Sequence, residues 1–117
     1  FRLATEYHDL FDGVMSFSPA VLIDAGDGLS VDALTPWALS GYKKPTTPFY
    51  IDNGGLGLES QLQPGIDLLL ANLDSIGLKR NKDYLWIKDP ASYHGELGWR
   101  ERFPFAFSWV FNSSKDY

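Results

Sequence analysis

The stretch that decides the fold reads PFYIDNGGLGLES and spans residues 48–60. Residues 49–51 are apolar, with the aromatic and β-branched content that is typical of a short buried strand. The polar and glycine-rich residues 52–55 follow and predict the end of that strand. A stripe with helical spacing comes next and predicts an amphipathic helix; it consists of Leu58, Leu62, Ile66, Leu69, Leu70, Leu73 and Ile76.

Two residues set the expected limits of this helix. Proline is tolerated in the first turn of a helix, so Pro64 predicts that the regular part starts near Gln63. Glycine readily adopts the left-handed conformation that follows many helices, so Gly77 is expected to end it.

Two further segments resemble buried strands, one on each side of this unit. Residues 14–17 are apolar and are followed by a Ser-Pro pair at 18–19. Residues 84–87 are also apolar, and an Asp-Pro pair at 89–90 is expected to end that strand. None of these strands alternates between apolar and polar side chains, which indicates a sheet that is covered on both faces.

The remaining segments are assigned from the same signals. Residues 24–32 are expected to be loop. Helices are predicted over residues 1–10, over 30–40 with Ser30 as the N-cap, and over 97–111 with a start or a kink at Pro104. Helices therefore alternate with strands, and this order predicts an α/β fold with three parallel strands and flanking helices.

Composition excludes several classes of function. The net charge is −5 and the ten basic residues are scattered, which argues against binding to nucleic acid. No apolar run approaches the roughly 20 residues that are needed to span a bilayer. The absence of cysteine excludes disulfides, thiolate catalysis and cysteine-ligated zinc.

Titratable side chains lie in the loops where an α/β sheet places its ligands. Such sheets bind ligands after the carboxyl ends of their strands, here residues 18–27, 52–59 and 89–96. The second loop contains Asp52 and Glu59, and the third contains His94. A carboxylate after one strand and a histidine after the next is the layout of two members of an acyl-transfer triad. In such a triad the histidine moves the proton of a serine, and the carboxylate orients the histidine.

Three segments carry a resemblance to a known family. Residues 8–20 (HDLFDGVMSFSPA) resemble the pattern P-x-L-F-x-x-V-x-x-x-S-P, and residues 50–59 resemble a strand and loop that bear a triad acid. Residues 94–102 match H-x-E-x-x-W-x-x-R. The chain thus resembles the C-terminal part of the enterochelin-esterase and feruloyl-esterase-like family of α/β-hydrolases, which also includes acetylxylan esterases, S-formylglutathione hydrolase and mycolyltransferases.

The resemblance implies a serine esterase that acts on a small-molecule ester and needs no metal or cofactor. His94 would be the general base and Glu59 the triad acid, with Asp52 as the rival acid. Trp99 is expected in the core or in a pocket wall, and Arg102 at the surface or in an ion pair. An acyltransferase of the same fold, or a non-catalytic binding domain, are the alternatives.

The nucleophile is expected upstream of this sequence. In α/β-hydrolases the triad follows the chain order serine, acid, histidine, and the serine lies in a G-x-S-x-G turn. No such string occurs here, and neither Ser16 nor Ser18 lies in such a turn. Residues 1–117 are therefore interpreted as a single partial domain. Its main partner would be the N-terminal half of the same domain, which carries the serine.

Overall fold

The computed structural model describes residues 7, 9–24, 30–32 and 47–113. The elements in chain order are β1 (Val14–Phe17), β2 (Leu22–Asp24), β3 (Ser30–Asp32), β4 (Phe49–Leu56), α3 (Leu58–Ser75), β5 (Tyr84–Tyr93) and α4 (Glu96–Ser113). Most of the helices predicted over 1–10 and 30–40 fall outside the described residues. At the described end of the first, Asp9 and Leu10 lie in a turn, and the Leu10 N–H donates to the Tyr7 carbonyl.

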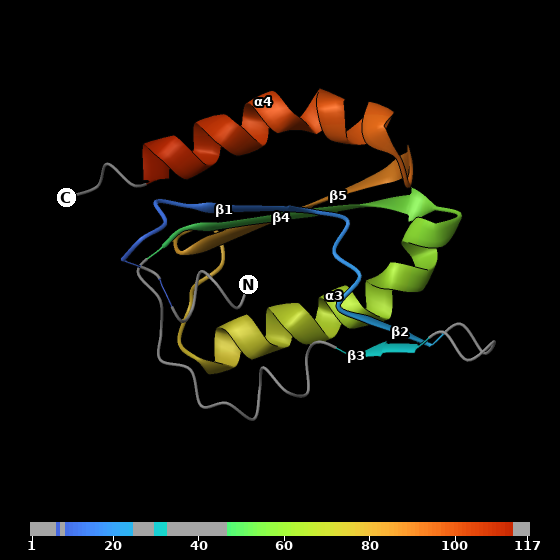
Figure 1. Ribbon diagram of the computed structural model, residues 1–117, viewed down its shortest axis with the longest axis horizontal. Helices are drawn as coiled ribbons and strands as arrows, with labels where there is room; N and C mark the ends of the chain where they lie inside the picture. Colours follow the sequence, from blue (N-terminus) through green and yellow to red (C-terminus); the bar gives the residue numbers. More distant parts are fainter. Residues whose placement is uncertain (1–6, 8, 25–29, 33–46, 114–117) are drawn as a thin grey trace.

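Three strands form a parallel sheet in the order β1-β4-β5, which confirms the predicted α/β class. Ser16 pairs with Ile51, and Ile51 pairs with Trp86 on the other side. The helix α4 covers one face of the sheet and α3 covers the other (Figure 1). The prediction of a sheet covered on both faces is therefore correct. The carboxyl ends of all three strands lie on the same side of the sheet, here called its carboxyl edge, so the loops that follow the strands meet there.

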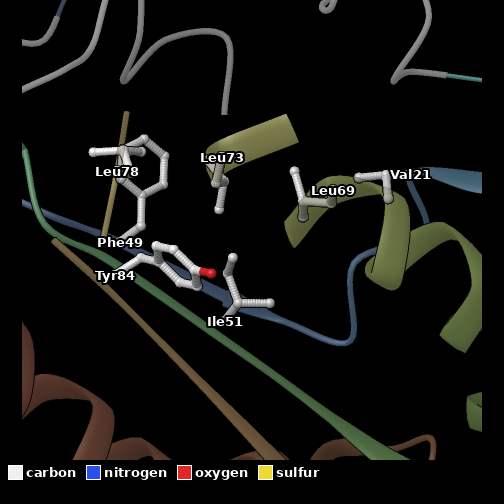
Figure 2. Close-up of a cluster of buried hydrophobic side chains, with 7 residues drawn as sticks. All are labelled: Val21, Phe49, Ile51, Leu69, Leu73, Leu78 and Tyr84. Carbon is white, nitrogen blue, oxygen red and sulfur yellow. The ribbon is translucent and has the colours of Figure 1, made fainter. Parts of the chain in front are cut away.

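Side chains of the central strand β4 alternate between the two layers because successive Cβ atoms point to opposite faces of a sheet. Phe49 and Ile51 point toward α3, where they pack with the helix residues Leu69 and Leu73 (Figure 2). The same cluster also contains Val21, Leu78 and Tyr84. Tyr50 points to the opposite face and packs with Ala106 and Val110 of α4. One strand thus supplies the centre of both cores.

The short antiparallel pair β2–β3 is a correction to the predicted structure. Residues 24–32 were expected to be loop and Ser30 to cap a helix, but Ser30 pairs with Asp24 in this hairpin. The hairpin lies next to α3 (Figure 1), and Leu22 packs against the core cluster between that helix and the sheet. Packing against a distant helix leaves no local signal in the sequence, so the pattern around Ser30 did not reveal the strand.

Both long strands extend beyond the residues that were predicted to end them. β4 continues from Ile51 to Leu56, and β5 continues through Asp89 and Pro90 to Tyr93. In the described sheet β5 lies at an edge, where a proline without an N–H is tolerated. The register between the two strands is irregular from Gly54 to Leu56, opposite this proline.

A proline misled the prediction of the start of α3, whereas the start of α4 was predicted to within one residue. α3 begins at Leu58, so Pro64 lies in its second turn rather than its first. α4 begins at Glu96, so the helix predicted over 97–111 is confirmed; Pro104 lies in its interior, and the alternative start at that proline is wrong. The predicted end of α3 is correct. Gly77 has a φ of 93°, its N–H bonds to the Asp74 carbonyl, and the next N–H bonds to Leu73.

Truncating a core leucine of α3 should destabilise the intact protein. Leu69 is fully buried, so Leu69→Ala removes apolar contacts and leaves a cavity, at a cost of about 2–5 kcal/mol. Leu68 is half exposed on the same helix, and Leu68→Ala is the matched control, with a cost below about 0.5 kcal/mol. Urea unfolding of both variants measures this difference. Equal losses would contradict the packing described for α3.

Candidate active site

The histidine and one of the two carboxylates meet at the carboxyl edge of the sheet. Glu59 is the second residue of α3 and is fully buried. His94 lies between β5 and α4, and its side chain is 31% exposed. The His94 Nδ1 atom lies 3.1 Å from Glu59 Oε1. The ring is thus anchored to a buried acid and still accessible from outside.

Glu59 receives donors on both of its oxygens. Oε1 accepts from Ser18 Oγ at 2.5 Å in addition to His94, and Oε2 accepts from the backbone N–H of Gly54 at 2.9 Å. An isolated buried carboxylate is strongly unfavourable, whereas one that receives hydrogen bonds on both oxygens is stabilised. These hydrogen bonds compensate Glu59 for the contacts with water that it loses by burial.

The contact from Gly54 requires glycine. A Cβ at this position would lie 2.3 Å from the Ser92 carbonyl oxygen and 2.9 Å from Glu59 Cγ. Both neighbours belong to the site, since Ser92 lies on β5 two residues before His94. The close approach of β4 to β5 and to Glu59 therefore depends on the missing side chain.

The contact with Glu59 determines which imidazole nitrogen carries the proton. An ionised carboxylate can only accept a hydrogen bond, so Nδ1 of His94 must be the protonated nitrogen. In the neutral ring the lone pair is then on Nε2. This is the tautomer that a general base needs when it takes a proton through Nε2.

Trp99 contacts two members of the site. Its ring meets the His94 ring edge to face, with centroids 5.1 Å apart and an interplanar angle of 88°. Its Nε1 donates to Ser18 Oγ at 2.9 Å. The tryptophan therefore lines the histidine, as a wall residue was expected to do, and it also makes a polar contact that the sequence did not predict.

Asp52 lies elsewhere in the network. It is fully buried and receives two hydrogen bonds from Arg102, Nε to Oδ2 at 2.8 Å and Nη2 to Oδ1 at 3.2 Å. Tyr50 Oη also donates to Oδ2 at 2.9 Å. Arg102 was expected at the surface or in an ion pair, and the ion pair is what the structure contains. The structure thus pairs His94 with Glu59, and Asp52 with Arg102.

Burial and the ion pair together shift the pKa values of Asp52, Arg102 and Tyr50. Burial raises the pKa of Asp52, while the hydrogen bonds from Arg102 and Tyr50 oppose that shift. Burial also lowers the pKa of Arg102, but the hydrogen bond and charge of Asp52 outweigh this effect and raise it. Burial, with the charge of Asp52 beside it, raises the pKa of the Tyr50 hydroxyl. Arg102 therefore stays charged next to Asp52.

Ser18 is the site residue whose role the sequence did not reveal. It was considered only as a nucleophile, whereas its hydroxyl contacts Glu59 and Trp99. One signal was available, because Ser18 directly follows β1 and so belongs to a loop at the carboxyl edge. The partner of that hydroxyl depends on a residue 41 positions away, which no local pattern shows.

A hollow of about 550 Å³ borders the histidine. It is lined by the end of β5 and the start of α4, namely Asp89, Ala91, Ser92, Tyr93, His94, Gly95, Glu96, Leu97, Gly98 and Glu101. This volume lies in the range of small-molecule binding sites.

The comparisons with known proteins add no relative. No protein-family model, no curated protein and no solved structure matches this chain. Among the described residues, no group of three His, Cys, Asp or Glu side chains could hold a metal ion. Neither helix in the described part of the chain is both long and apolar enough to cross a membrane. The resemblance to esterases therefore stays a prediction.

Removing the arginine of the ion pair should destabilise the intact protein in a pH-dependent way. Arg102→Met leaves Asp52 buried without a cation, at a cost of about 3–5 kcal/mol near pH 8. Loss of Arg102 raises the pKa of Asp52 further in the folded state. When the folded-state pKa of a carboxyl is raised, the protein loses stability as the pH rises toward and through that pKa. The destabilisation caused by Arg102→Met therefore shrinks toward pH 5.

The measurement is urea unfolding at pH 5 and pH 8. Arg100→Met is the control, because Arg100 is exposed on the same helix and carries the same charge. It should change the free energy of unfolding by less than about 0.5 kcal/mol at either pH. A penalty for Arg102→Met that stays constant between the two pH values would argue against a buried, uncompensated Asp52.

Proposed function

We propose that the protein is a serine carboxylic-ester hydrolase, in which this chain supplies the general base His94 and the triad acid Glu59. One observation carries the proposal: the Nδ1 atom of a partly exposed histidine lies 3.1 Å from a fully buried glutamate at the carboxyl edge of a parallel sheet. That edge is where α/β sheets bind ligands.

The pair has the geometry for proton transfer in acyl chemistry. Glu59 holds the proton on Nδ1 and leaves Nε2 as the base that takes the proton of a serine hydroxyl. The serine attacks the ester carbonyl, and the imidazolium that forms is stabilised by the adjacent carboxylate. The same Nε2–H then protonates the departing alkoxide, and water repeats the sequence on the acyl-enzyme.

The nucleophile in this proposal comes from polypeptide upstream of residue 1. Ser18 does not suit the role because its hydroxyl donates to Glu59 rather than to the imidazole of His94, the proposed general base. The order of the fold supports an upstream serine. The acid follows β4 and the histidine follows β5, as in the last strands of an α/β-hydrolase sheet, where the serine comes first.

The substrate class follows from the surroundings of His94. The adjoining hollow of about 550 Å³ accommodates a small-molecule ester, and Tyr93 and Leu97 give it exposed apolar surface. The acyl-transfer chemistry of the triad requires no metal or cofactor.

Hydrolysis of p-nitrophenyl acetate by the intact protein tests this proposal. His94→Ala and Glu59→Gln should each lower kcat by about a thousandfold or more, because members of a triad act as one unit. Asp52→Asn should lower kcat far less per folded molecule, since Asp52 is held by Arg102. Asp67→Asn is the control, an exposed carboxylate further along α3.

Two results would overturn the assignment. Full activity of His94→Ala would show that His94 is not the general base, and the proposed function would then fail. Loss of activity in a folded Asp52→Asn variant, together with an active Glu59→Gln variant, would transfer the role of the acid to Asp52.

A further inference from the structure

Four residues from four separate segments, the acid among them, contact one another in a closed circuit. Its part from Trp99 through Ser18 to Glu59 is called the relay below. Trp99 on α4 contacts Ser18 after β1, Ser18 contacts Glu59 on α3, and Glu59 contacts His94 before α4. The aromatic side chains of His94 and Trp99 contact each other and close the circuit. Apart from the His94–Glu59 contact, none of these interactions is part of the proton transfer proposed above.

The chemistry of these groups fixes the direction of every hydrogen bond. An indole nitrogen is only a donor, so Ser18 Oγ accepts from Trp99. The single hydroxyl proton of Ser18 is then directed to Glu59, which as a carboxylate only accepts. Glu59 in turn leaves His94 as the donor on its side. The arrangement has one consistent set of proton positions, and that set gives His94 a free Nε2.

We propose that Ser18 and Trp99 are positioning residues that fix the Glu59 carboxylate and, through it, the tautomer and orientation of His94. This inference rests on the proposed function, because it concerns the same acid and base. Neither residue touches the reacting atoms. Each acts through Glu59, and Trp99 also acts directly on the plane of the imidazole.

The backbone of Ser18 supports a role that depends on its hydroxyl. Its φ is 49°, in the left-handed region that residues with a Cβ avoid and glycine adopts readily. Its N–H continues the strand ladder by donating to the Asp52 carbonyl at 2.7 Å. Glycine would suit this backbone better, yet it has no side chain that could join Trp99 to Glu59 as the Ser18 hydroxyl does. Unfavourable backbone at such a position points to a functional requirement.

The position of Trp99 is fixed by the helix that carries it. Arg102 lies three residues further along α4 and is bound to the buried Asp52. This ion pair joins the first turns of α4 to the middle of β4, so the indole is held against Ser18. The two carboxylates therefore have different roles. Asp52 anchors α4 through Arg102, and α4 carries the Trp99 side chain that contacts Ser18, the donor to Glu59.

The test uses three variants of the intact protein. Ser18→Ala removes the hydroxyl, Ser18→Gly removes it and relaxes the backbone, and Trp99→Phe keeps an aromatic ring but removes the N–H. Each should lower kcat for p-nitrophenyl acetate by about 10- to 100-fold and leave KM within about twofold. The Ser18 variants lose the hydrogen bond to the Glu59 carboxylate, and Trp99→Phe loses the donor that directs the Ser18 hydroxyl to it. Ser75→Ala and Trp109→Phe are controls that lie outside the site.

A second readout does not depend on esterase activity. The Nδ1 proton of His94 should give a downfield ¹H resonance that is absent in His94→Ala. In the Ser18 variants this resonance should shift upfield or disappear through exchange with water, while Ser18→Gly keeps the unfolding midpoint of the parent. A purely structural role would lower the midpoint without moving the resonance in the folded protein.

The outcomes separate the relay from the proposed function. Unchanged kcat and an unchanged His94 resonance in Ser18→Gly and Trp99→Phe would overturn the relay, even in an active esterase. If the parent protein hydrolyses no ester, the proposed function fails and the resonance alone decides. Its loss in Ser18→Gly then supports the relay, and its persistence overturns it.

Discussion

The burial of Glu59 constrains this end of the sheet more than any other single feature. A carboxylate without contact to water must receive donors from its surroundings, and the three that it receives come from separate segments of the chain. Ser18 comes from the end of β1, Gly54 from β4, and His94 from the loop after β5. Parallel pairing of the three strands is what places these donors together. The fold thus creates a site as a consequence of satisfying one buried charge.

A second buried carboxylate lies close enough to matter. The charge of Glu59 adds to the burial that raises the pKa of Asp52, so the two acids disfavour each other. The structure separates their partners: Asp52 has a permanent cation in Arg102, whereas Glu59 has an imidazole that changes charge during proton transfer. A guanidinium stays protonated at neutral pH, so the arginine suits anchoring and the histidine suits proton transfer.

Much of this arrangement could be predicted from the sequence because it depends on local patterns. The apolar stripe of α3, the three apolar strands and the glycine after α3 gave the α/β class, and strand ends pointed to His94, Glu59 and Asp52. The hairpin at Ser30 and the long strands through Pro90 depend on tertiary packing and on the place of β5 at an edge. The sequence could not show that Glu59 pairs with His94 and Asp52 with Arg102, because this pairing depends on where α4 places Arg102.

The location of the imidazole proton tests the central claim most directly. Selective ¹⁵N labelling of histidine in the intact protein, measured where His94 is neutral, reports which ring nitrogen carries the proton. The account predicts a protonated Nδ1 and an unprotonated Nε2 at His94, because Glu59 accepts from Nδ1. Glu59→Gln should shift this balance toward the other tautomer. A proton found on Nε2 in the parent protein would contradict the account.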